Sequence, residues 1–246
     1  MPTDEPRTRW QAFHLVKAGN APAEYEDAFA ANASRTRFAV ADGASEASFA
    51  AAWARLLVGG FVEGEKPWRD LAWAAPARQR WSAEVDGLEV PWYAEAKREM
   101  GAFATFLGAA FRRPGADGRG AWRAAAVGDS CLFHLRRGRL RRAFPLTRSD
   151  EFDNAPRLLC SRRAPAGNDV PVRAGGHWRR GDRFLLATDA LAQWFLREVE
   201  RGGDPVADVS GILAEADPQA AFPAWVETRR AGGLRNDDVT LLVIDL

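Results

Sequence analysis

The chain has 246 residues, and its 34 basic and 33 acidic side chains leave a formal net charge of +1. A length near 250 fits one large domain or two small ones, and a hydrophobic fraction of 47% with 10 Trp and 14 Phe excludes a disordered chain. The balanced charge gives no global reason to expect nucleic acid or an anionic membrane as a partner.

Neither the cysteines nor the N-terminal residues suggest secretion. Cys131 and Cys160 are too few for a disulfide scaffold, and no Cys or His spacing suggests zinc. The N-terminal residues have no apolar stretch typical of a signal peptide, and no apolar run approaches the roughly 20 residues of a spanning helix. We therefore expect a cytoplasmic protein that has neither a membrane nor a nucleic acid as partner.

Short apolar segments with polar or glycine boundaries predict strands, and segments with apolar residues at helical spacing predict helices. In chain order we expect a strand at 37–41, helices at 45–61, 68–85 and 91–100, strands at 103–111 and 122–127, a hairpin of 131–137 with 139–144, a strand at 183–188, helices at 191–200, 206–216 and 218–230, and a strand at 239–246. This order favours an α+β fold. The segment 147–180 has weak periodicity and is too long for a plain connector, which suggests a flap.

Aspartates adjoin the most apolar predicted strands. Three strands run directly into Asp42, Asp129 and Asp189, and the last strand is preceded by Asp237. Single acids of this kind are commonly turn or helix-cap residues, but a carboxylate at a buried strand end is costly unless it is paired or binds metal. Ends and starts of antiparallel neighbours lie side by side, so these four can converge. Carboxylates without His or Cys select Mg²⁺, Mn²⁺ or Ca²⁺, and two such ions about 3.5–4 Å apart can promote phosphoester hydrolysis.

Five short motifs occur in order along the chain: EDAF at 26–29, ADG at 41–43, AVGDS at 126–130, LLATD at 185–189 and DDVT at 237–240. As a set they resemble the type-2C metal-dependent protein phosphatases, as a divergent member of bacterial type, from about Phe13 to the last residue. The resemblance implies one domain over 1–246, built as a four-layer α-β-β-α sandwich of two antiparallel sheets flanked by helices.

The resemblance also implies an activity, the hydrolysis of phosphoserine and phosphothreonine in a protein substrate that a protein kinase has modified. A water bridging two Mg²⁺ or Mn²⁺ ions would attack phosphorus directly, and Asp42, Asp189 and Asp237 would act through that water. Carried over by motif, the metal ligands would be Asp27, Asp42, the Gly43 carbonyl, Asp189 and Asp237, with Asp129 and Asp189 holding a third, weaker ion.

The sequence departs from the family pattern at several positions. Pro22 stands where the family commonly has a phosphate-binding Arg, so Lys17 or an arginine from another segment is the candidate for that role. Ala44 stands where some members have a His proposed as general acid. Asp238 replaces an Asn, and strand alternation predicts that its side chain points outward. These departures favour an alternative, a weak or inert phosphatase-like binding or regulatory module that retains metals.

Arginines gather on the predicted hairpin, and they suggest either an anion-binding patch or a solvated strand face. The hairpin context favours the solvated face. His14, His134 and His177 are scattered without ligand spacing, so we expect packed or surface roles for them. The hairpin arginines are Arg136, Arg137, Arg139, Arg141 and Arg142.

Overall fold

The computed structural model describes residues 8–44, 49–64, 71–115, 118–153, 155–162 and 170–246. Two five-stranded antiparallel sheets and a short strand pair form its centre. The first sheet has the order β1 (Arg9–Leu15), β12 (Val239–Asp245), β11 (Asp182–Ala187), β7 (Cys131–Arg136) and β8 (Arg139–Phe144). The second has the order β10 (Val172–Arg179), β6 (Arg119–Val127), β5 (Phe106–Arg112), β3 (Arg37–Ala41) and β2 (Ala28–Ala31). The short pair is β4 (Phe103–Ala104) with β9 (Leu159–Cys160).

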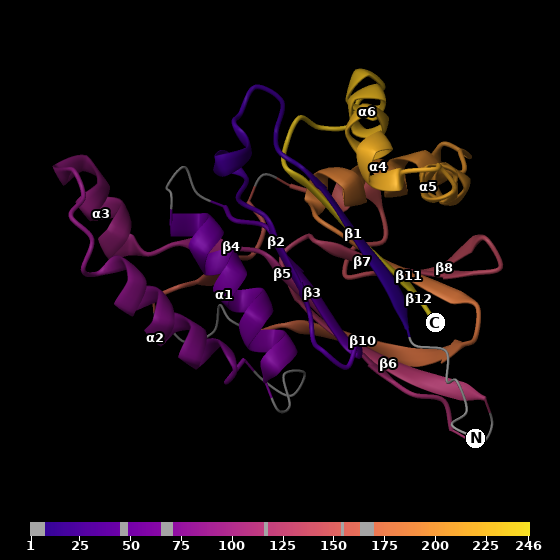
Figure 1. Cartoon of the computed structure of the whole chain (residues 1–246), viewed down its shortest axis with the longest axis horizontal. Helices are drawn as coiled ribbons and strands as arrows, with labels where there is room; N and C mark the ends of the chain where they lie inside the picture. Colours follow the sequence, from indigo (N-terminus) through magenta and orange to yellow (C-terminus); the bar gives the residue numbers. More distant parts are fainter. Residues whose placement is uncertain (1–7, 45–48, 65–70, 116–117, 154, 163–169) are drawn as a thin grey trace.

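Helices cover the outer faces of both sheets (Figure 1). On the second sheet, α1 (Phe49–Glu63) packs on β2 and β3, and α2 (Ala74–Val85) packs on α1 and leads to α3 (Trp92–Met100). On the first sheet, α4 (Asp189–Glu200) and α6 (Pro218–Ala231) pack on β12 and β1, with α5 (Pro205–Leu213) beside them. Two short 3-10 helices, η1 (Pro22–Glu24) and η2 (Ser149–Glu151), lie in connections. The predicted α-β-β-α sandwich is therefore confirmed.

Three hydrophobic clusters fill the three interfaces between these layers. Along β11, Phe184 and Leu186 belong to the cluster between the two sheets, whereas Leu185 and Ala187 belong to the cluster under α4, α5 and α6. This alternation is the period of two that a strand imposes on its side chains. Because both faces of the central strands are buried, those strands are apolar at nearly every position, which made them visible in the sequence.

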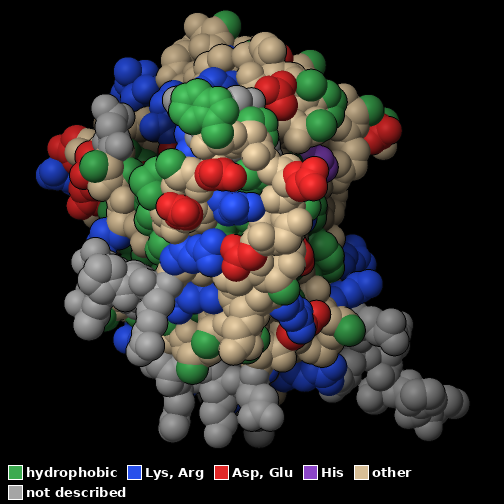
Figure 2. Space-filling model, turned by 90° about the vertical axis from the view of Figure 1, so that its left-hand side faces the viewer, with side chains coloured by type: hydrophobic (Ala, Val, Ile, Leu, Met, Phe, Trp, Pro, Cys, Tyr) green, Lys and Arg blue, Asp and Glu red, His purple; other side chains and the backbone are tan. Residues whose placement is uncertain are grey.

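The face formed by α1, α2 and α3 carries charged side chains of both signs, interspersed with hydrophobic ones (Figure 2). Trp73 and Trp81 are buried beneath it, whereas Trp92 is 83% exposed. Among the described helices, none has the length and apolar character needed to cross a bilayer.

Several elements differ from the sequence prediction. The strands β1, β2, β9 and β10 were not predicted. The strand expected at 103–111 is split at Thr105, whose backbone N–H donates to the Asp42 carbonyl over 2.8 Å. The helix expected from residue 45 is described only from Phe49, since 45–48 lie outside the described residues.

The segment 147–180 was expected to include a flap. Its final part, β10, pairs with β6 along its whole length, from Val172 opposite Ala126 to Arg179 opposite Arg119. That part is a sheet strand and not a flap. Residues 154 and 163–169 of the segment lie outside the described residues.

Close packing between α1 and β5 leads to a first prediction. A Cβ atom added to Gly108 would lie 2.5 Å from the buried Phe61 ring, whereas one added to Gly59 on α1 would meet no atom within 4 Å. We expect Gly108→Ala to lower the free energy of unfolding by about 1–3 kcal/mol. Gly59→Ala should leave it unchanged or raise it by up to about 1 kcal/mol. Urea unfolding of both variants measures this, and equal stabilities would contradict the packing described.

Candidate functional site

The aspartates singled out in the sequence lie at one end of the two sheets. Asp42 follows β3, Asp189 follows β11 as the first residue of α4, and Asp237 precedes β12. Asp129 lies between β6 and β7, and Asp27 precedes β2. In the pairing of β2 with β3, Ala28 is opposite Ala41, and in the pairing of β11 with β12, Ala187 is opposite Leu241. The antiparallel register thus brings the strand ends that carry these acids to one rim.

The pKa of Asp42 shows the effect of the neighbouring charges most clearly. Burial, followed by the negative charges of Asp237 and Asp129, raises its pKa to about 7, and a hydrogen bond to Asp27 and the charge of Arg235 act in the opposite direction. A carboxyl group with a raised pKa lies near other negative charges and away from water, both of which disfavour its ionised form. Such a place favours a bound cation.

Asp27 is held by two threonines. Its Oδ2 accepts hydrogen bonds from Thr188 Oγ1 at 2.9 Å and from Thr240 Oγ1 at 2.6 Å. Its Oδ1 is buried without a hydrogen-bond partner among the described residues. Burial, followed by the charge of Asp42, raises the Asp27 pKa well above its ordinary value. The residue therefore presents one fixed oxygen and one free oxygen to the cluster.

Asp129 also has a buried Oδ1 without a partner in the described part of the chain. Burial raises its pKa to about 6. Gly128 precedes it with a φ of +98°, and a Cβ there would lie 2.7 Å from the Thr105 Cβ. Only glycine fits this turn, which fixes the direction in which Asp129 leaves β6.

Gly43 approaches its neighbours closely. A Cβ at this position would lie 2.8 Å from the Glu26 carbonyl oxygen and 3.0 Å from the Ala50 Cβ. Gly43 also bridges Ala104 of β4. Glycine is required here because the backbone lies directly against the segment that carries Asp27. Ala44, at the position of the family's His, is exposed.

Arg235 lies within the acidic cluster and was not found by the sequence analysis. Its guanidinium forms a salt bridge with Asp189, and its Nη2 lies 3.4 Å from Asp237 Oδ2. Its charge also lowers the pKa values of Asp42 and Asp129. One cation of the chain itself thus interacts with four carboxylates. The chain has 31 arginines, and the available sequence signal for a role of Arg235 in the site was its position next to the last aspartate motif.

Asp238 does not point outward, so that prediction is wrong. It is 8% exposed, and its two carboxylate oxygens accept the backbone N–H groups of Lys17 and Glu26, each at 2.7 Å. These bonds tie the segment after β1 to the start of β12. The two backbone N–H groups replace the hydrogen bonds to water that the carboxylate loses on burial. Asp238 can therefore point inward, although the alternation of side chains along a strand predicted that it points outward.

Lys17 and Pro22 are both exposed on that segment. Pro22 begins η1, where no side-chain donor is available to a phosphate. The Lys17 charge acts on this region, since it lowers a Glu26 pKa that burial and Asp238 raise to about 7. Lys17 therefore remains a candidate for phosphate binding.

The cluster fits divalent metal ions in the chemistry of its donors. All its candidate ligands are oxygen atoms, and two of them are buried without a partner among the described residues. The pKa values of Asp27, Asp42 and Asp129 are raised, in each case mainly by burial. Within the described residues no three His, Cys, Asp or Glu side chains already form a metal cage. The guanidinium of Arg235 lies against Asp189 and Asp237, two of the candidate ligands.

No protein-family model matches the chain, and no curated protein matches it. Solved structures match it along nearly its whole length. The Mycobacterium tuberculosis serine/threonine phosphatase PstP/Ppp is 19% identical, with a TM-score of 0.62, over 97% of this chain and 98% of that one. The photosystem II phosphatase PBCP is 17% identical, with a TM-score of 0.64, over the same shares.

A third structure is the catalytic domain of PstP in complex with two manganese ions. It is 20% identical, with a TM-score of 0.61, over 97% of both chains. At these identities the likeness establishes the fold. The chain therefore has the fold of the metal-dependent serine/threonine phosphatases, as its motifs indicated.

The raised pKa values predict how stability changes with pH. An acid whose pKa is higher in the folded state than its unfolded value near 4 stabilises the fold at low pH, and this contribution is lost as the pH rises through the folded pKa. For Asp42 and Glu26, with folded pKa values of about 7, and Asp129, at about 6, the loss falls between about pH 4 and 7. We expect the melting temperature of protein in chelator to fall across this window, less steeply in Asp42→Asn.

Adding Mn²⁺ near neutral pH should reverse this fall in the wild type, because a cation neutralises the repelling carboxylates. The Asp42→Asn variant should gain less. Differential scanning calorimetry measures both effects. A melting temperature that rises with pH in chelator, or an equal gain from Mn²⁺ in both proteins, would refute this electrostatic description.

Proposed function

We propose that this protein is a Mg²⁺- or Mn²⁺-dependent phosphatase that hydrolyses phosphoserine and phosphothreonine in proteins. The observation that carries the proposal is the convergence of carboxylates at one end of a sandwich whose structural neighbours are serine/threonine phosphatases. When bound, two metal ions supply positive charge for the phosphoryl oxygens and a water acidic enough to attack phosphorus near neutral pH. The converging acids are Asp27, Asp42, Asp129, Asp189 and Asp237.

The chain's part in this chemistry is to fix oxygen ligands in place. Asp42, Asp189 and Asp237 extend from the ends of paired strands, and the two threonine bonds hold Asp27. The Gly43 carbonyl would add a neutral ligand from a position where a side chain would clash with the Glu26 carbonyl oxygen. We assign these groups to two ions, and Asp129 with Asp189 to a third, weaker one. Ligands on rigid strand ends need little reorganisation to bind.

Arg235 is our candidate for the group that binds the substrate phosphate. Pro22 cannot bind it, and a guanidinium recognises phosphate through two parallel hydrogen bonds. In the absence of ions Arg235 neutralises Asp189 and Asp237. Its side chain is 37% exposed, so it could turn toward an incoming phosphate if bound ions neutralised these two carboxylates. Lys17 is the second candidate.

The substrate class implies a partner and a setting. A phosphorylated protein substrate requires a protein kinase that produces it. Cys131 and Cys160 are both buried, and we place the protein in the cytoplasm. Because Ala44 has no ionisable group, another side chain or water would have to protonate the leaving oxygen.

The enzyme proposal is tested by Asp42→Asn. We expect hydrolysis of an aryl phosphate and of a phosphothreonine peptide with Mn²⁺ to fall about a hundredfold or more, because the variant loses a shared metal ligand. The matched control is Asp245→Asn, which removes a carboxylate paired with Arg183 at the opposite end of β12. Wild-type protein that binds Mn²⁺ in calorimetry and hydrolyses neither substrate would establish the inert-module alternative. Turnover of the aryl phosphate alone would indicate a small-molecule substrate.

Arg235→Ala tests phosphate binding separately from chemistry. We expect the KM for the phosphopeptide to rise about tenfold with a smaller change in kcat, because a substrate contact is lost. Calorimetric titration should show tighter Mn²⁺ binding, because the competing cation is gone. Lys17→Ala, measured in parallel, shows which residue binds the phosphate. Weaker Mn²⁺ binding in Arg235→Ala would mean that Arg235 supports the metal ligands and does not compete with metal.

A further inference from the structure

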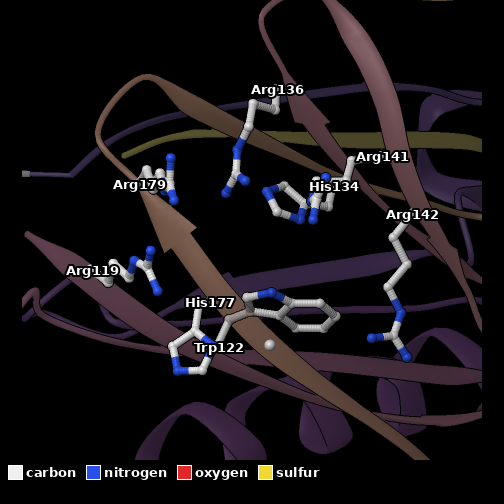
Figure 3. Close-up of a pocket in the computed structure, with 9 residues that line it drawn as sticks. Arg119, Trp122, His134, Arg136, Arg141, Arg142, His177 and Arg179 are labelled. Carbon is white, nitrogen blue, oxygen red and sulfur yellow. The ribbon is translucent and has the colours of Figure 1, made fainter.

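A cavity of about 470 Å³ opens between the edges of the two sheets, away from the acidic cluster. Five arginines line it from four strands: Arg119 on β6, Arg136 on β7, Arg141 and Arg142 on β8, and Arg179 on β10. Figure 3 shows their side chains arranged around an open space, with His134, His177 and Trp122 between them. Of the nine lining residues, all within the described part of the chain, none is acidic.

This arrangement changes the interpretation of the arginine-rich hairpin. The sequence favoured a solvated strand face for its five arginines. Arg137 and Arg139 fit that interpretation, since both are exposed at the turn and neither lines the cavity. Arg136, Arg141 and Arg142 instead join arginines from the facing sheet. Convergence from two sheets is a tertiary feature that the hairpin sequence alone does not contain.

A buried carboxylate holds part of the lining in place. Asp182 is 2% exposed and accepts from Arg136 Nε and Nη2, each at 2.7 Å, from His134 Nε2 at 2.8 Å and from the Arg179 backbone N–H at 2.9 Å. These four bonds use the carboxylate fully. Its negative charge is therefore shared among Arg136, His134 and the Arg179 backbone. Among the residues that the structure describes, it forms no hydrogen bond with the side chains of Arg141, Arg142 or Arg179.

Arg142 is positioned in a second way. Its guanidinium lies over the buried Trp122 ring, 5.4 Å from the centroid, and its Nη1 donates to the Gly175 carbonyl at 3.0 Å. In the described part of the chain, the side chains of Arg141 and Arg179 have no acidic partner. Five guanidinium groups around one hollow repel one another, and a bound polyanion relieves that repulsion.

The cavity lies at the opposite end of the strands from the acidic cluster. Asp182 begins β11 and Asp189 follows its end, so the two sites are separated by roughly 20 Å at about 3.3 Å per residue. The cavity volume falls in the range of pockets for small ligands, about 300–1,000 Å³. Guanidinium groups bind phosphate oxygens in pairs.

From these observations we propose that this cavity is a binding site for a small molecule with two or more phosphate groups. A single phosphate would leave most of the guanidinium charge uncompensated. Two or three linked phosphates can contact the guanidinium groups on β6 and β10 and, at the same time, those on β7 and β8. The site is distinct from the proposed catalytic site and needs no metal.

The test is calorimetric titration of tripolyphosphate, pyrophosphate and inorganic phosphate into the whole protein with chelator present. Without metals the acidic cluster repels anions, so binding there does not interfere and the result does not depend on phosphatase activity. We expect tripolyphosphate to bind at one site, at least about tenfold more tightly than inorganic phosphate. Affinity should fall as salt is added.

Arg141→Ala with Arg179→Ala should weaken tripolyphosphate binding at least about tenfold. Both side chains are exposed, so the fold should persist, and circular dichroism checks this. The matched control is Arg55→Ala with Arg80→Ala, two exposed arginines on α1 and α2. No saturable binding in the millimolar range, or equal losses in both double variants, would overturn the proposal. A single-stranded oligonucleotide that displaces tripolyphosphate and binds more tightly would replace it with a nucleic-acid site.

Discussion

Burial of carboxylates at one end of the two sheets determines the chemistry of the candidate site. The apolar strands bring Asp27, Asp42 and Asp129 into surroundings with little water, where burial and nearby carboxylates raise the pKa of each. A protein keeps such an arrangement only if a cation compensates it. In this chain Arg235 supplies that charge when no metal does. We propose that divalent cations compensate the same carboxylates when they are bound.

The sandwich architecture creates both charged regions of the molecule. β6, β7 and β11 each have one end beside Asp129 or Asp189 and the other end beside Arg119, Arg136 or Asp182, so the same strands position residues at both sites. The formal net charge of +1 thus conceals two strong local fields of opposite sign. The helical face of α1, α2 and α3, with charges of both signs interspersed, has no comparable field (Figure 2).

The sequence predicted those parts that local pattern determines. Asp42, Asp129, Asp189 and Asp237 could be found because each adjoins an apolar strand, and Asp27 because its motif resembles the family's. The strands β1, β2 and β10 escaped prediction because RWQAFHL, AFAA and VRAGGHWR lack a clear strand pattern and gain their conformation from pairing. The roles of Arg235 and Asp238 were not predicted, because they depend on which backbone or carboxylate groups lie beside these residues in three dimensions.

The central claim is that the carboxylate cluster holds divalent cations. It is tested most directly by the anomalous difference density of crystals grown with saturating Mn²⁺. If the cluster binds these cations, we expect peaks in contact with oxygen atoms of Asp42, Asp189 and Asp237. We also expect that the Arg235 guanidinium no longer contacts Asp189. A map with no peak at these residues, and with Arg235 still paired to Asp189, would contradict it.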